Sequence, residues 1–140
     1  MKVIENCWDA IGAAECEYGA HLFDGSVAKI YVSHGLDVGL EMSQLFMRKN
    51  DEGYAGHCLL VFNGIKSFDF VVNQYEMQGG DPMWHDPITT RYSGDIQDGV
   101  STYHLAGGLY GFEAYVSIEI EARSFELHIL EKDDPVHKFC

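Results

Sequence analysis

The sequence predicts a mainly β (α+β) domain, an antiparallel β-sandwich or a partly closed barrel with one short N-terminal helix. Three observations indicate this fold class. Apolar and polar residues alternate in several segments, no strand–helix–strand rhythm is present, and one segment alone has a helical pattern. The 140 residues, 46% of them hydrophobic, can fill the core of a single domain, 1–140, with residues 133–140 as a tail.

The first third of the chain combines the predicted helix with two strands. The helix covers residues 7–18, with Asn6 as a suitable N-cap and Gly19 as a stop. Branched and aromatic residues at 27–32 predict a strand. Apolar and polar residues then alternate over 36–43, which is typical of a half-buried strand, and the change of phase after them predicts a bulge.

The middle third contains two further strands and a weakly patterned region. A glycine-rich turn leads into an apolar run at 57–64, which indicates a strand covered on both faces. The next strand, 68–75, is expected to pair with it through a hairpin at 63–64, because Asn-Gly is a hairpin signal. Prolines and glycines interrupt residues 79–99, which therefore give a weak pattern.

Two short strands and a long hairpin are predicted for the rest of the chain. Residues 88–92 and 101–107 have the composition of short strands. Alternation over 112–121 and again over 125–130 predicts a long hairpin with its turn at 123–124. One face of this hairpin is apolar and belongs to the core, and the other carries a ladder of carboxylates.

Acidity is the strongest compositional signal. The formal charge is −13, and residues 69–122 hold nine acidic residues against one basic residue, Arg91, a local charge of −8. Such a field repels nucleic-acid phosphates and anionic lipids and attracts basic partners. With no signal-peptide pattern and no membrane-length apolar run, we expect a cytoplasmic protein whose four cysteines are reduced.

No catalytic motif stands out. The seven histidines have no HxH or HExxH spacing, there is no GxSxG elbow, and the glycines form no phosphate-binding loop. The segment DIQDG at 95–99 lacks the ligand ladder of a calcium loop. The sequence therefore predicts no enzyme, no cofactor and no metal, although the heptapeptide DPMWHDP at 81–87 sets His85 among carboxylates and prolines.

Aromatic residues among carboxylates predict a partner-binding surface instead. Aromatic side chains supply affinity at an interface, while charges steer the partner and raise the association rate. The candidate residues are Asp81, Trp84, Asp86, Tyr92, Asp95, Asp98, Glu113, Tyr115, Glu119 and Glu121. For Trp84 two roles stay open, an anchor for a partner or a plug at one end of the fold.

One combination of residues points to a family. It consists of Trp8, Ile11, Tyr18-Gly19, Phe23-Asp24, Val27, the apolar run 59–62, Gly64-Ile65 and the closing alternation to Leu130. This pattern resembles the small bacterial immunity proteins of polymorphic toxin systems, in particular the immunity protein 50 group, in which residues 79–90 have no counterpart. The resemblance implies a cytoplasmic protein that binds and neutralises a cognate toxin domain, often a basic nuclease.

Two other function classes stay open. A small-ligand-binding protein or metal-dependent enzyme would use the mouth of a β-barrel, with Asp81, His85 and Asp86 at its rim. A scaffold or oligomerisation module would form a stable homo-oligomer and bind no ligand. Elemental analysis and a measurement of size in solution would distinguish these classes from a toxin-binding protein.

Overall fold

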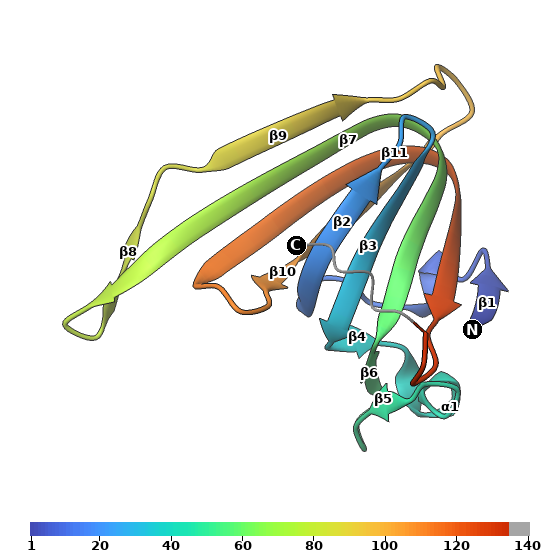
Figure 1. Cartoon of the computed structure of the whole chain (residues 1–140), viewed down its shortest axis with the longest axis horizontal. Helices are drawn as coiled ribbons and strands as arrows, with labels where there is room; N and C mark the ends of the chain where they lie inside the picture. Colours follow the sequence, from blue (N-terminus) through green and yellow to red (C-terminus); the bar gives the residue numbers. More distant parts are fainter. Residues whose placement is uncertain (135–140) are drawn as a thin grey trace.

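The main sheet of the protein closes on itself. In the computed structural model, which describes residues 1–134, five strands form a ring in which each pairs with the next (Figure 1). In ring order they are β2 (Cys16–Phe23), β3 (Val27–His34), β7 (Cys58–Gln78), β11 (Ala114–Ile129) and β10 (Ser101–Leu109). The predicted mainly β fold is confirmed as a partly closed barrel. The predicted tail, 133–140, lies outside the described residues from 135 onward.

Short elements extend the ring at its edges. β1 (Lys2–Glu5) pairs with the end of β11, and β8 (Asp81–Trp84) and β9 (Ile88–Ser93) pair with successive parts of β7. A small second sheet lies together with a helix at one end of the ring (Figure 1). Its elements are β4 (Leu36–Asp37), α1 (Gly39–Ser43), β5 (Arg48–Lys49) and β6 (Tyr54–Gly56).

A short parallel seam closes the ring between β2 and β10. Three residue pairs form it, and two of them involve Gly107 and Gly108 of β10. A Cβ at position 107 would overlap the carbonyl oxygen of Cys16 in β2. Gly107 therefore allows a backbone approach that no residue with a side chain permits.

The predicted N-terminal helix is wrong. Within residues 7–18 the only helical part is a single 3-10 turn, Trp8–Ala10, and β2 begins at Cys16. Cys16 and Tyr18 are buried, whereas Glu15 is exposed, so residues 15–18 alternate as a strand does. Pairing with β3 and β10 then gives the strand its hydrogen-bonding partners. The barrel contacts thus override a marginal local helix signal.

Helix α1 stands where alternation predicted a strand at 36–43. β4 ends at Asp37, and Gly39 has a φ of 79°, a left-handed conformation that turns the chain out of the strand. Ser43 Oγ then donates a hydrogen bond to the carbonyl oxygen of Leu40 (2.9 Å). Bonds between residues three apart continue through Phe46, so the predicted bulge after this segment is also wrong.

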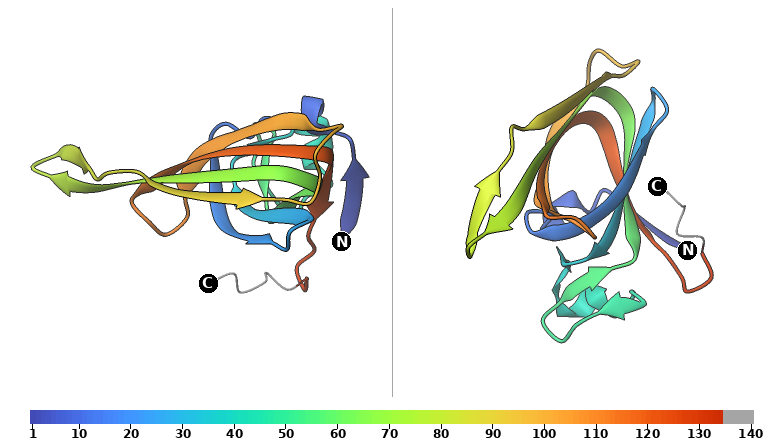
Figure 2. Two further views of the ribbon diagram at one scale, coloured as in Figure 1. Left: turned by 90° about the horizontal axis from the view of Figure 1, so that it is seen from above. Right: turned by 60° about the vertical axis from the view of Figure 1, so that its left-hand side comes forward.

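The two predicted hairpins are wrong for one shared reason. β7 continues through residues 63–64 and β11 through 123–124, and the two long strands pair with each other and arch together over the ring (Figure 2). Their register shifts between Glu121 and Ala122. This shift leaves Lys66 of β7 as the bulged residue, because Glu121 lies opposite Ser67 and Ala122 opposite Ile65. At 62–65 and 122–125 both strands change apolar phase together and stay paired, and Gly64 has a φ of 69°. The signals that suggested turns therefore mark a bend in two continuous strands.

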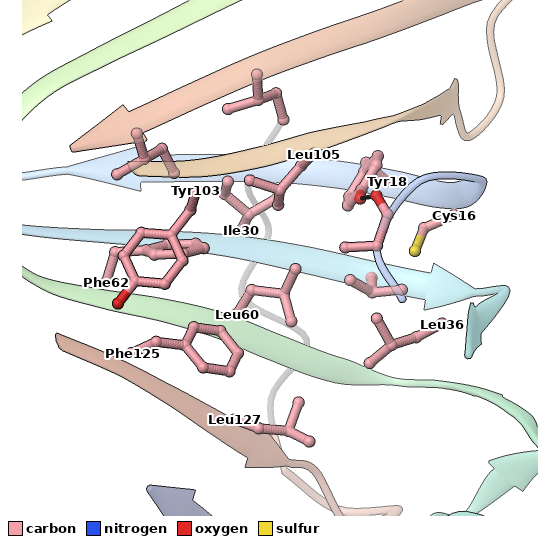
Figure 3. Packing of buried hydrophobic residues seen from close by; sticks show 14 of the residues in the cluster. Cys16, Tyr18, Ile30, Leu36, Leu60, Phe62, Tyr103, Leu105, Phe125 and Leu127 are labelled. Carbon is pink, nitrogen blue, oxygen red and sulfur yellow. Dashed lines mark hydrogen bonds between the residues drawn. The ribbon is translucent and has the colours of Figure 1, made fainter. Parts of the chain in front are cut away.

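The interior of the ring is filled by apolar and aromatic side chains. Figure 3 shows Phe62, Tyr103 and Phe125 side by side within it. Trp8 packs edge-on against all three, with ring centroids 5.0 to 5.9 Å apart. Trp8, from the 3-10 turn, therefore belongs to the aromatic packing of the barrel.

The apolar run at 57–64 is covered on both faces, as predicted. Leu60 and Phe62 point into the main core, whereas Leu59 and Val61 pack on the opposite face with Tyr31 and other residues. Within residues 1–134, no helix is both long and apolar enough to cross a membrane.

His21 gives the barrel a pH-dependent stability. Its ring stacks on Phe70, with centroids 4.5 Å apart and planes 25° apart, and burial lowers the pKa of His21 below its ordinary value of 6.5. The folded protein therefore holds His21 neutral at a pH at which the unfolded chain takes up a proton. Stability from this residue is complete above about pH 6.5 and is lost as the pH falls toward the lowered pKa.

We expect the variant His21→Phe to lose part of this acid sensitivity. Urea unfolding at about pH 7.5 and about pH 5 should show a smaller fall in unfolding free energy for the variant than for the wild type. His34→Gln is the control, because His34 is exposed and its ring nitrogen contacts the neutral hydroxyl of Ser33, so the difference between the two pH values should stay largely unchanged. Equal acid sensitivity in His21→Phe and wild type would contradict the assignment.

Candidate partner-binding surface

β7 extends beyond the ring to form a two-stranded arm with β8. Tyr75–Gln78 pair with Asp81–Trp84, and the arm stands clear of the ring (Figure 1). Gly79 and Gly80 form its turn, and both have positive φ angles, 59° and 89°, as a tight two-residue hairpin requires. Every residue from 76 to 91 is exposed to solvent. The heptapeptide at 81–87 thus forms one strand of the arm and the loop that follows it.

One face of the arm is apolar. Tyr75 lies opposite Trp84, and Met77 lies opposite Pro82. Directly opposite residues share a face of an antiparallel pair, and so do residues two apart on one strand. The ring centroids of Tyr75 and Trp84 lie 5.0 Å apart, and Trp84 remains 57% exposed. Of the two roles left open for Trp84, a plug in the core is therefore excluded.

The other face of the arm is mainly polar and acidic. It carries the opposite pairs Glu76 with Met83 and Gln78 with Asp81. His85 follows on the same side, and its Nε2 lies 3.7 Å from Oε1 of Glu76. The arm is thus amphipathic, although both of its faces are in contact with solvent.

The apolar face of the arm continues onto the outside of the ring. The backbone N–H of Tyr75 donates a hydrogen bond to the carbonyl oxygen of Glu113 (3.0 Å). Tyr115 of β11 follows Glu113 by two residues and is 43% exposed. Alternation places Glu113 and Tyr115 on the same side as Tyr75. We call Tyr75, Met77, Pro82, Trp84 and Tyr115 the aromatic face, which has Glu113 beside it.

Charged side chains form a row across the outer surface of the ring. Arg91 of β9 lies opposite Asp69 of β7, and Asp69 lies opposite Glu119 of β11. Glu119 in turn lies opposite His104 of β10, with 3.8 Å between its Oε2 and the histidine Nδ1. Glu113 and Glu119 are therefore exposed on the carboxylate side of the C-terminal strand, as predicted, whereas Glu121 is half-buried, and Arg91 offsets part of the charge.

Most of the remaining acidic candidates lie apart from the aromatic face. Asp86 is two residues beyond Trp84 in the loop between β8 and β9, whereas Asp95 and Asp98 are in the loop between β9 and β10. Glu121 accepts a hydrogen bond from Ser67 Oγ (2.7 Å), and Ser67 precedes Tyr75 on β7 by a length of strand of about 27 Å. The predicted acidic residues thus do not form one cluster.

Tyr92 does not belong to this outer surface. It is half-buried, and its ring centroid lies 5.1 Å from that of Phe23 and 5.4 Å from that of Phe68. These contacts place Tyr92 against the main core on the inner side of β9. The prediction that Tyr92 belongs to an exposed partner-binding surface was therefore wrong, because residues 88–93 alternate and position 92 falls on the inner face.

Tyr75 and Met77, the β7 half of the arm, were not among the predicted surface residues. Tyr75 was placed at the end of the predicted strand 68–75 and Met77 just beyond it, although Gly79-Gly80 follows and Asp81–Trp84 comes next. A Gly-Gly pair between two extended segments is a hairpin signal and would have identified the arm. Its partner strand was obscured by Pro82, a residue that sheets accept at an edge.

The residues proposed for the rim of a metal or ligand site lie on the arm and in its loop, not at the mouth of the barrel. Asp81 is on the arm, and His85 and Asp86 are in the loop that follows it. Across residues 1–134, the structure contains no group of three or more His, Cys, Asp or Glu side chains that could hold a metal ion. His85 has Glu76 as its nearest acidic partner.

Comparison with known proteins gives no relative from which a function can be transferred. No family model, no curated protein and no solved structure matches the chain. The resemblance to the immunity protein 50 group stays a prediction, and function has to be inferred from the surface itself.

Proposed function

We propose that this protein is a non-enzymatic inhibitor that binds a basic toxin domain, in the manner of a bacterial immunity protein, with the aromatic face as its anchor. The observation that carries the proposal is the pair of half-buried Tyr75 and exposed Trp84 on an arm that projects from an acidic barrel. The toxin is further expected to be a nuclease-type domain, because acidic side chains can occupy a cleft built for phosphate groups.

The arm supports this proposal because the barrel gains little from its apolar face. A two-stranded ribbon is marginally stable in water, and this one leaves Trp84, Met77 and Met83 more than half exposed. Aromatic side chains that become buried against a partner contribute much of the binding free energy at interfaces. The arm therefore has the composition of a contact surface.

The charges support a basic partner. The acidic face of the arm, with Glu76 and Asp81, lies back to back with the aromatic face, and Glu113 lies beside the latter. Together with the charge of −13, these carboxylates would steer a cationic domain toward the arm and raise its association rate. Most of this steering acts over long range and is weakened by salt.

Co-expression with the toxin domain encoded immediately upstream tests the proposal. We expect the two proteins to copurify and the toxin's activity to be inhibited. The association rate should fall by about tenfold or more between low and near-molar salt, because screening removes the steering. Absence of a complex at low salt would contradict the proposal. A stable homo-oligomer that buries the aromatic face, seen by light scattering, would favour the scaffold class instead.

A further inference from the structure

A hollow of about 470 Å³ lies at the end of the barrel opposite the arm. Three segments meet there: the start of β1, the connection from α1 to β5, and the end of β11 with the residues that follow it. Ile129, which lines the hollow, lies opposite Cys58 at the first position of β7, whereas the arm begins at Tyr75. The volume falls within the range of small-molecule sites.

The hollow has an apolar floor and an apolar rim. Phe46, Ile129 and Leu130 line it and are buried, so the floor is part of the packed structure. Leu45 and Met47 line it as well and are 42% and 55% exposed. A ligand with an alkyl or aryl group would cover these two side chains and remove apolar surface from water.

The charge around the hollow is opposite in sign to that of the whole protein. Three of the nine lysines and arginines of the chain line it, namely Lys2, Lys49 and Lys132. Nζ of Lys49 donates a hydrogen bond to the carbonyl oxygen of Phe46 (3.2 Å), which holds one ammonium group over the apolar floor. In a chain with a charge of −13, this concentration of cations is unexpected.

Two carboxylates in the lining offset only part of this positive charge. They belong to Glu131 and Asp133. The terminal amino group of Met1, which lies outside the lining, is 3.5 Å from Oε1 of Glu131 and 3.4 Å from Oδ2 of Asp134. With this cation and Asp134 counted as well, four positive groups stand against three carboxylates, so the three lysines still give the hollow a balance of one positive charge.

We propose that this hollow is a binding site for a small amphipathic carboxylate. The alkyl or aryl part lies on Phe46 and Ile129 and covers Met47, and the carboxylate pairs with the ammonium groups of Lys49 and its lysine neighbours. This site is independent of the toxin-binding role, because it uses none of the residues of the aromatic face.

Calorimetric titration of the whole protein with three probes that share a ten-carbon chain tests the proposal. Each probe is kept below its micelle concentration or, for the alcohol, below its solubility limit. The probes are decanoate, decanol and decyltrimethylammonium. The overall charge of −13 favours the cationic probe, whereas the lysines of the hollow favour decanoate. The order of affinity therefore shows whether the net charge or the local lysines decide which probe binds. We expect one decanoate site, with an affinity about tenfold or more above that of decanol.

Lys49→Gln should weaken decanoate binding by about fivefold or more and leave decanol binding unchanged, because the apolar contacts remain. The matched control is Lys66→Gln, which makes the same change in net charge at an exposed position of β7 outside the hollow. Decyltrimethylammonium binding as tightly as decanoate, or an equal loss of decanoate affinity in both variants, would overturn the proposal. Unchanged urea unfolding verifies that both variants are folded.

Discussion

Replacement of Gly107 by alanine is expected to prevent folding or to lower the free energy of unfolding by more than about 4 kcal/mol. A Cβ at this position would overlap the Cys16 carbonyl oxygen, which is backbone and cannot rotate away. The φ of Gly107, 153°, is also one that residues with a side chain rarely adopt. Because the seam between β10 and β2 consists of three residue pairs, forcing these strands apart opens the ring.

Two further glycine variants make the test of the seam quantitative. Gly111→Ala has a similar conformational cost, since its φ is 85°, but a Cβ there meets no described atom within 4 Å, so a loss of about 1–2 kcal/mol is expected. Gly108→Ala should cost less than either, because Gly108 has no positive φ and its Cβ meets only the movable carboxylate of Glu17. Urea unfolding gives the order, and equal losses at positions 107 and 111 would show that the seam contributes little.

Strand positions were predictable where composition and period agree. The segments predicted at 27–32, 88–92 and 101–107 lie within β3, β9 and β10, and the ends differ by no more than two residues. Residues 123–124 show the limit of such predictions. Alternation changes phase there, and a turn and a bend in a continuous strand produce the same change in a single sequence. Only the pairing of β11 with β7 decides between them.

The candidate surface was predictable in composition but not in arrangement. Trp84, Glu113 and Tyr115 come together because β7, β8 and β11 are neighbours in this register. Asp95 and Asp98 contribute to the same acidic composition, yet they lie in the loop beyond the other end of β9. Net charge along a chain contains no information on which strands pair, so it predicts a kind of partner and not the position of the interface.

The two tryptophans are expected to separate binding from folding. Trp84→Ala should weaken binding of the toxin domain by about thirtyfold or more, as at interface hot spots, and change the unfolding free energy by less than about 1 kcal/mol. Trp8→Ala should cost about 3–5 kcal/mol of stability, because its ring packs against Phe62, Tyr103 and Phe125. The fraction of Trp8→Ala that stays folded should bind the toxin domain as the wild type does.

Calorimetric titration and urea unfolding of the same samples measure both effects. Trp84→Phe is the graded control, since it keeps an aromatic ring opposite Tyr75 and should recover most of the affinity. Phe112→Ala removes another exposed ring, 67% accessible, from the turn between β10 and β11, and should bind like the wild type. If Trp84→Ala bound the toxin domain unchanged while Phe112→Ala did not, the interface would lie at the turn between β10 and β11 and the aromatic face would lose its proposed role.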